Sequence, residues 1–288
     1  MVIKVTLSRE DNPINQIKES LEIAKKIEEA FTKREEVTLD FSEVSWILPC
    51  SAILISGKII EVQNQGASIK YLPPENPEVK EWLSDIGFPL GKKIDGNTYV
   101  SIKHFFNNPE DRKQVNREAN ELLDKMGDKI PKEFGDSVRY IIGELSDNID
   151  QHSQFTLASM MAQYYPKKEY LDIAVLDNGI SIPLLFEKNH ILFSQDSDAI
   201  LKAISGEVTT KKDEQMRAYG LRSCKDITIE GIKGELHVIS RKGSIIVEPS
   251  KKPLLYNFDS VGLEGTLLYF RLKTPKKEIN IYPYLDRR

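Results

Sequence analysis

The sequence predicts an α/β domain followed by an α+β domain, and three observations lead to this fold class. The chain has 288 residues, about twice the usual length of a single domain. Strand and helix patterns alternate over residues 1–100, whereas over residues 105–275 helices come first and strands follow. A polar stretch at residues 91–108 separates the two regions and marks the expected domain boundary, and residues 276–288 form a C-terminal tail.

The N-terminal region alternates short apolar runs with amphipathic segments. The opening residues MVIKVTLSRE alternate apolar and polar side chains, which is the pattern of a strand. Asn12-Pro13 and Asn76-Pro77 each combine a helix-capping residue with a proline at the first helical position. The predicted elements are a strand at the N-terminus, a helix from Pro13 to Phe31, a strand at Val37–Phe41, a helix at Ala52–Val62, a strand at Ala67–Leu72 and a helix from Pro77 to Gly87. This order indicates a layered α/β domain.

The C-terminal region begins with helical patterns and continues mostly as strands. Apolar residues recur at the helical period, and a glycine follows the first of these helices. The predicted elements are helices at Val115–Met126, Phe134–His152 and Gly220–Glu230, and strands at Thr98–Ile102, Leu157–Tyr164, Tyr170–Leu176, Glu235–Ser240, Ser244–Val247 and Thr266–Leu272. We expect helices packed on a mostly antiparallel sheet.

Composition narrows the classes of function. Forty basic residues against 44 acidic ones give a net charge of -4, which disfavours nucleic acid as a partner because phosphate binding draws on an excess of Lys and Arg. The two cysteines, Cys50 and Cys224, form no C-x-x-C pair, so neither a disulfide framework nor a structural zinc site is indicated. The sequence shows no apolar run of the roughly 20 residues that span a bilayer. We therefore expect a cytoplasmic protein without membrane contact.

The helix at Phe134–His152 carries the first candidate site residues. Glu144, Asn148 and His152 follow one another at i, i+4 and i+8, so they line one track at the edge of the apolar stripe. A carboxylate, an amide and an imidazole on one partly buried track can serve acid–base or metal chemistry. An ordinary amphipathic helix with polar residues at its border gives the same pattern, and this alternative stays open.

Two further segments resemble ligand-binding turns. The strand at Tyr170–Leu176 runs into Asp177-Asn178-Gly179, which places a carboxylate at a strand end beside a flexible glycine. Lys211, Lys212 and Arg217 precede a helix that starts near Gly220, and the N-terminus of a helix favours phosphate. A simple turn and a loop with exposed lysines are the corresponding alternatives.

In this order the motifs resemble those of the Bergerat-fold ATP-binding domain that DNA gyrase, histidine kinases and MutL share, the GHKL superfamily. The resemblance covers residues 105–275 and implies Mg²⁺ and ATP as cofactors. Four sequence boxes carry it: Glu144 to His152, Asp177 to Ser181, Ala218 to Leu221, and Gly265-Thr266. Ser181 and Ala218 stand where the family has glycines. The segment between the second and third boxes, Pro183 to Tyr219, would be a lid over the nucleotide and is expected to move.

The resemblance implies a role for each matching residue. Glu144 would be the base that activates water, and Asn148 the magnesium ligand. Asp177 would accept a hydrogen bond from the adenine amino group. The remaining nucleotide contacts that the resemblance implies are His152, Gly179, Gly220, Leu221, Gly265 and Thr266.

Residues 1–100 are similar to the STAS domain of anti-sigma-factor antagonists. The match rests on the segment from Leu39 to Ser51, the following helix and the close at Gly87-Phe88. In the regulatory members a serine in the turn before that helix is phosphorylated by a partner kinase. Here the acceptor position falls on Cys50, and Ser51 is the neighbouring hydroxyl.

The sequence thus leads to one main hypothesis and one alternative. The main hypothesis is a Mg²⁺–ATP-binding regulatory protein of the GHKL type that hydrolyses ATP or phosphorylates a protein, with a protein partner bound through the STAS-like domain. The alternative is a non-catalytic, nucleotide-sensing interaction module. Retention of Glu144 favours the enzyme, whereas Ser181 and Ala218 favour the module. A homodimer is one assembly that the sequence leaves open.

Overall fold

The secondary structure follows the sequence pattern closely. The computed structural model describes residues 1–9, 13–91, 96–107, 130–148, 154–207, 220–275 and 280–285, together with residues 117, 120–121 and 123–124. The helices are α1 (Pro13–Thr32), α2 (Pro49–Asn64), α3 (Pro77–Asp85), α5 (Lys132–Asn148), α6 (Ile182–Lys188), α7 (Asp196–Ser205), α8 (Gly220–Asp226) and α9 (Tyr282–Leu285), and a π-helical segment (Ile227–Gly231) follows α8. The strands are β1 (Val2–Lys4), β2 (Val37–Asp40), β3 (Ile69–Leu72), β4 (Tyr99–Phe106), β5 (Leu157–Tyr165), β6 (Tyr170–Asp177), β7 (Glu235–Arg241), β8 (Gly243–Val247), β9 (Leu254–Asn257) and β10 (Leu263–Lys273).

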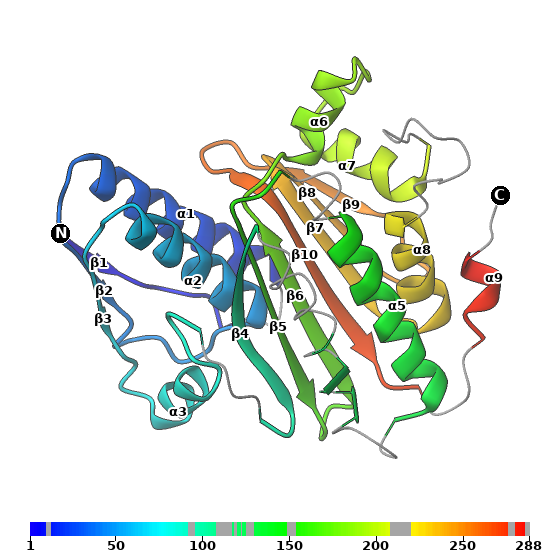
Figure 1. The fold of residues 1–288 in the computed structure, drawn as a ribbon, viewed down its shortest axis with the longest axis horizontal. Helices are drawn as coiled ribbons and strands as arrows, with labels where there is room; N and C mark the ends of the chain where they lie inside the picture. The colour runs from blue at the N-terminus through cyan, green and yellow to red at the C-terminus, as the bar shows by residue number, and fades with distance from the viewer. Residues whose placement is uncertain are drawn as a thin grey trace.

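These elements form four layers (Figure 1). From left to right in that view they are a three-stranded sheet, helices α1 and α2, a seven-stranded sheet, and helices α5, α7 and α8. The three strands pair in the order β1-β2-β3 and run parallel. The seven strands pair in the order β4-β5-β6-β10-β7-β8-β9, and each neighbouring pair is antiparallel. The expected combination of an α/β layer with helices on an antiparallel sheet is confirmed at this level.

Local signals explain where individual elements begin. The Asn76 side chain accepts hydrogen bonds from the backbone N–H groups of Glu78 and Val79, at 3.0 and 3.2 Å, and so caps α3 as the sequence predicts. Helix α2 begins at Pro49, earlier than the predicted Ala52, because a proline is well suited to the first helical turn.

Both faces of the seven-stranded sheet are buried. Side chains alternate along β6, so that Ile173 and Val175 join the cluster beneath α5 while Ala174 and Leu176 join the cluster beneath α2. Every residue of β6 is buried. A strand that is buried on both faces has to satisfy any polar side chain it carries within the protein.

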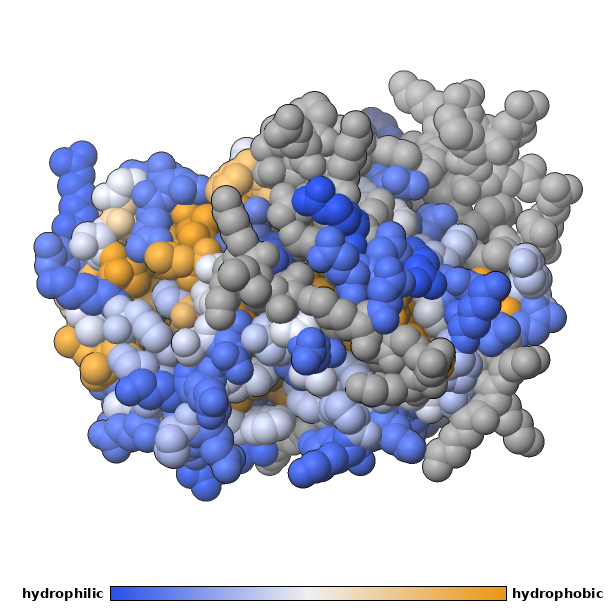
Figure 2. All heavy atoms as spheres, turned by 60° about the horizontal axis from the view of Figure 1, so that its bottom comes forward, coloured by the Kyte–Doolittle hydropathy of each residue, from blue (hydrophilic) through white to orange (hydrophobic). Residues whose placement is uncertain are grey.

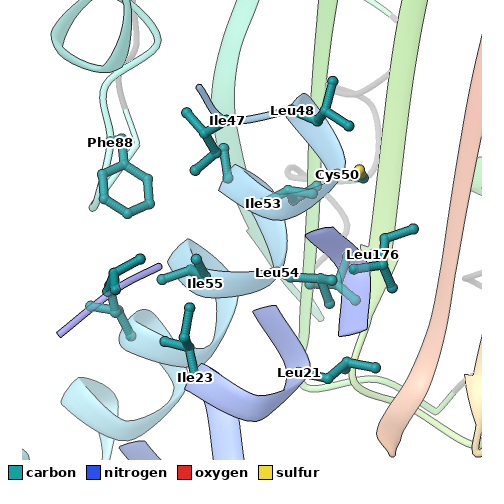
Figure 3. Close-up of a cluster of buried hydrophobic side chains, with 14 of the residues drawn as sticks. Leu21, Ile23, Ile47, Leu48, Cys50, Ile53, Leu54, Ile55, Phe88 and Leu176 are labelled. Atoms are coloured by element: carbon teal, nitrogen blue, oxygen red, sulfur yellow. The ribbon is translucent and has the colours of Figure 1, made fainter. Parts of the chain in front are cut away.

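The three-stranded sheet together with helices α1 to α3 is called the N-terminal layer below. Helix α2 packs this layer directly onto the seven-stranded sheet. Figure 3 shows Leu54 of α2 and Leu21 of α1 beside Leu176 of β6, within one buried cluster that continues to Phe88. A Cβ atom on Gly57 would lie 2.9 Å from Cδ2 of Leu176, so this glycine permits the close approach of helix and sheet. The division of the chain into two domains stays a prediction, and the two regions share a hydrophobic core.

Polar contacts reinforce the same interface. The Trp82 indole donates a hydrogen bond to Oε1 of Gln163 on β5, at 3.0 Å. His104 on β4 lies between two serines, with Nε2 3.0 Å from Ser56 Oγ on α2 and Nδ1 2.8 Å from Ser159 Oγ on β5. Burial lowers the pKa of His104 to about 4, so the ring is neutral and works as a connector near neutral pH.

Several elements lie outside the sequence prediction. Helices α6 and α7 occupy the first part of the expected lid, and β9 adds an edge strand. The predicted helix at Val115–Met126 falls mostly outside the described residues. The C-terminal tail includes α9, and Ile281 and Tyr284 pack against the cluster beneath α5, so this part of the tail is held by the core.

The surface in view in Figure 2 is mostly hydrophilic. Its apolar surface gathers mainly on the left, on the side of the N-terminal elements. Val2 and Leu72 of the three-stranded sheet are 68% and 48% exposed. In the described part of the chain we find no helix with the length and apolar character that a membrane span requires.

Candidate functional site

Asp177 ends β6 as a buried carboxyl group. Residues two apart on a strand point to the same face, so the Asp177 side chain lies on the α5 face of the sheet with that of Val175. Asp177 is 6% exposed there. The backbone N–H of Gly179 donates to Oδ1 at 2.8 Å, and among the described residues this is the one hydrogen bond to the carboxyl group. Burial raises the pKa of Asp177 to about 7, while the Gly179 N–H opposes the rise. Oδ2 is therefore an acceptor without a protein donor there.

Gly265 makes room for the chain at Asp177. It has φ +89°, and a Cβ atom there would lie 1.9 Å from the carbonyl oxygen of Asp177. The pairing of β10 with β7 shifts register between Leu263 and Thr266, and Thr266 then pairs with Asp177 on β6. Only glycine accommodates both this backbone angle and this contact.

A serine connects the beginning of α6 to the sheet. Ser240 Oγ accepts a hydrogen bond from the Ile182 N–H and donates one to the carbonyl oxygen of Gly265, each at 2.9 Å. It also lies 3.0 Å from Oγ1 of Thr266. Ser181 caps α6, since its Oγ accepts the Leu184 N–H at 3.3 Å. Ser181, which stands where the GHKL resemblance expects a glycine, therefore has a structural use here.

Asn178 is engaged on the other side of the turn. Its Oδ1 accepts the backbone N–H groups of Thr156 and Leu157 at 3.0 and 2.9 Å, which ties the turn to the beginning of β5. Its Nδ2 donates to Glu61 Oε1 on α2 at 3.1 Å. Glu61 pairs with Lys58, which also lies 3.1 Å from Glu28 on α1. The residue beside Asp177 thus contacts the N-terminal layer, which the sequence pattern did not indicate.

A cavity of about 400 Å³ lies beside Asn178. It opens between α1, α2 and the strand ends, and its lining includes Leu21, Leu54, Lys58 and Leu176. These side chains belong to the α2 side of the sheet, opposite the face that carries the Asp177 side chain. Asp177 also contributes to the lining, so the cavity reaches the residue that ends β6.

Glu144 lies on α5, where this helix packs against α8. It is partly buried. Burial raises the pKa of the neighbouring Tyr140 to about 12, with Ser223 opposing and the Glu144 charge adding to the rise. Burial and the charge of Glu144 also raise the pKa of the Cys224 thiol. Glu144 therefore lies close to α8.

Gly220 and Leu221 form the first turn of α8, one turn before Cys224. The packing of α5 on α8 thus brings the predicted base and the predicted phosphate contacts onto one pair of helices. Asn148 is the last residue of α5, and its side chain lies outside the described part of the chain. His152, Lys211, Lys212, Arg217 and Ala218 also lie outside it.

The first part of the expected lid is fixed to the sheet. Arg241, the last residue of β7, donates hydrogen bonds to Asp196 Oδ2 at 2.8 Å and to Glu187 Oε1 at 2.7 Å. Asp196 also accepts the backbone N–H of Lys242 at 3.0 Å. Movement of α6 and α7 away from the sheet would break a charged, bidentate contact.

The position at which the STAS resemblance predicts a phosphoacceptor is buried. Cys50 and Ser51 lie at the beginning of α2 and are both 0% exposed. Figure 3 shows the Cys50 sulfur on the side of α2 that faces the strands of the larger sheet. Burial, followed by the charge of nearby Asp172, raises the pKa of the thiol to about 12. Neither side chain is open to a partner enzyme in this structure.

Two groups of predicted residues are therefore assembled. Asp177, Gly179, Gly265 and Thr266 meet at the ends of β6 and β10, and Glu144 lies beside α8. The described residues contain no group of three or more His, Cys, Asp or Glu side chains that could hold a metal ion. Compared with known proteins, the chain matches no family model, no curated protein and no solved structure.

The pKa of Asp177 predicts a pH dependence of stability. The carboxyl ionises near 3.8 without the burial and near 7 in the fold, so the folded state keeps its proton between these values and the unfolded state does not. Its contribution to stability falls as the pH rises through this window and is constant above it. An asparagine at this position does not titrate, so Asp177→Asn removes this loss. The free energy of unfolding of the variant minus that of the parent should therefore rise by about 2–4 kcal/mol from pH 4 to pH 8.

Urea unfolding across this pH range measures the difference. Asp147→Asn is the matched control, because Asp147 is exposed on α5. A constant difference between the Asp177→Asn variant and the parent would contradict a carboxyl with a raised pKa at this position.

Proposed function

We propose that this chain binds Mg²⁺–ATP at the ends of β6 and β10 and couples nucleotide state to a protein partner through its N-terminal layer. The observation that carries the proposal is the buried Asp177 carboxyl, which has one oxygen without a protein donor. Burial of this carboxyl disfavours its ionised form and raises its pKa, and titratable groups perturbed in this way concentrate where ligands bind. The order of the four sequence boxes gives independent support.

Asp177 suits an exocyclic amine such as the 6-amino group of adenine. A donor that reaches Oδ2 stabilises the ionised carboxylate and so lowers the raised pKa. Gly265 supports the same role, because any side chain there would push β10 away from Asp177. Recognition of adenine through one buried carboxylate would also discriminate against guanine, which presents a carbonyl oxygen at the corresponding position.

The reaction would depend on Glu144 and Asn148. When bound, Mg²⁺–ATP supplies an activated phosphoryl group whose developing charge the metal neutralises. Glu144 would accept a proton from water or from a protein hydroxyl, and Asn148 would hold the metal through its amide oxygen. The first turn of α8, at Gly220 and Leu221, would offer backbone N–H groups to phosphate oxygens.

A route for coupling begins at Asn178. This residue follows Asp177 directly and bonds to Glu61 of α2, which pairs with Lys58, and Lys58 pairs with Glu28 of α1. A ligand that shifts the Asp177–Gly179 turn would therefore change a contact with the N-terminal layer. Cys50 and Ser51 are buried, so the partner would bind elsewhere on this layer. The outer face of the three-stranded sheet, where Val2 and Leu72 are exposed, is such a surface.

Adenine recognition by Asp177 gives the first test of this function. Isothermal titration of the parent with ATP and Mg²⁺ should show magnesium-dependent binding, and Asp177→Asn should weaken it by about tenfold or more, since an amide can present an N–H to the amine. Asp147→Asn should bind as the parent does. Equal affinity of Asp177→Asn and the parent would remove the adenine assignment.

Turnover separates the enzyme from the non-catalytic module. Glu144→Gln keeps the shape of the side chain but cannot accept the proton, so phosphate release or transfer to protein should fall by about 10²–10⁴-fold while ATP affinity stays near the parental value. Asp147→Asn, on the same helix, should retain parental turnover. Measurable binding without any turnover in the parent would favour the nucleotide-sensing module.

Coupling predicts an effect of a residue that does not touch the nucleotide. Asn178 Nδ2 donates to Glu61 and to the Thr156 hydroxyl, and Glu61→Ala removes the partner on α2, so ATP affinity should weaken by about three- to tenfold. Glu29→Ala, an exposed change on α1, is the control. In an Asn178→Ala background the effect of Glu61→Ala should disappear, and additive effects in this double-mutant cycle would argue against the route.

A further inference from the structure

Strand β9 leaves the seven-stranded sheet with an apolar free edge. It is the last strand of the sheet and pairs only with β8 among the described residues. Leu254, Leu255 and Tyr256 are 46%, 43% and 40% exposed. An exposed apolar edge strand is a template on which another strand can pair.

The direction of the free backbone groups can be derived from one hydrogen bond. The Phe258 N–H donates to the carbonyl oxygen of Lys242 at 2.8 Å, in line with the β8–β9 register. In an antiparallel pair alternate residues turn both backbone groups to the same neighbour, so Leu254 and Tyr256 face β8. Leu255 and Asn257 therefore direct their N–H and C=O groups outward, and nothing in the described part of the chain bonds to them from that side.

We propose that a second copy of this chain pairs antiparallel along β9, with the two-fold axis at Leu255. Each Leu255 N–H then donates to the carbonyl oxygen of Leu255 in the other copy. Each Asn257 N–H donates to the carbonyl oxygen of Pro253 in the other copy. Pro253 has no N–H and therefore ends the ladder, which limits the pairing to this short segment.

Side chains on both faces of this ladder are self-complementary. On the α7 face Leu255 meets Leu255 of the second copy, and on the opposite face Leu254 meets Tyr256 of the second copy. Cross-strand pairs between aliphatic and aromatic side chains stabilise a sheet. A shift of the axis to Tyr256 would place Leu255 opposite Asn257, so the apolar pattern favours the axis at Leu255.

The mass of the protein in solution tests the dimer. Sedimentation velocity of the full chain over a wide range of concentrations should show a species of twice the chain mass of 32.9 kDa. Leu255→Lys places like charges directly on the axis and should weaken association by about tenfold or more. Leu72→Lys, on the edge strand of the other sheet, should associate as the parent does. A parent that stays monomeric, or equal effects of both changes, would overturn the proposal.

Cysteine cross-linking tests the register and does not depend on the stability of the lysine variant. In the proposed pair Leu255→Cys brings two sulfurs together at a hydrogen-bonded position, where the Cα atoms are about 5.5 Å apart and a disulfide can form. Tyr256→Cys faces Leu254 and should cross-link far less under the same oxidant. The native Cys50 and Cys224 are buried and provide a silent background. Efficient linkage of Tyr256→Cys without linkage of Leu255→Cys would overturn the axis.

Discussion

Burial of β6 on both faces is the constraint on which the other features of this protein depend. The strand lies between helix α2 on one side and helix α5 on the other, so a carboxylate on it cannot rely on water. The strand carries two of them. Asp172 is met by Arg271, at 3.0 Å, and by the Tyr269 hydroxyl, at 2.7 Å, which oppose the effect of burial on its pKa. Asp177 has only a backbone N–H.

The two carboxylates differ in the partners that the protein gives them. Asp172 belongs to a buried ion pair, and such pairs are kept together by mutual hydrogen bonds. Asp177 has the same burial without a cation, so its ionised form becomes favourable when a ligand supplies a donor. A fold selected only for stability has no use for a buried carboxyl that has a single backbone donor and no cation. This difference is the physical ground on which we propose that a ligand binds at Asp177.

The N-terminal layer takes part in the same arrangement. It covers the sheet through α2, and its polar contacts reach β4, β5 and the turn after β6: Ser56 bonds to His104, Trp82 to Gln163, and Glu61 to Asn178. Cys50, at the beginning of α2, is buried beneath this cover. A regulatory role for this layer would therefore act through its packing and its outer face.

The sequence by itself determined most helices and strands, because apolar periodicity and capping residues act locally. It placed Asn76 at the beginning of α3 and put Asp177 and Gly265 at special positions. It missed α6, α7 and β9, whose short segments are held by distant residues such as Arg241 on Asp196. Only the tertiary structure decided that Asp177 and Cys50 are buried and that Asn178 donates a hydrogen bond to Glu61. Each of these depends on strands and helices far apart in the chain, and periodicity carries no information about which of them meet.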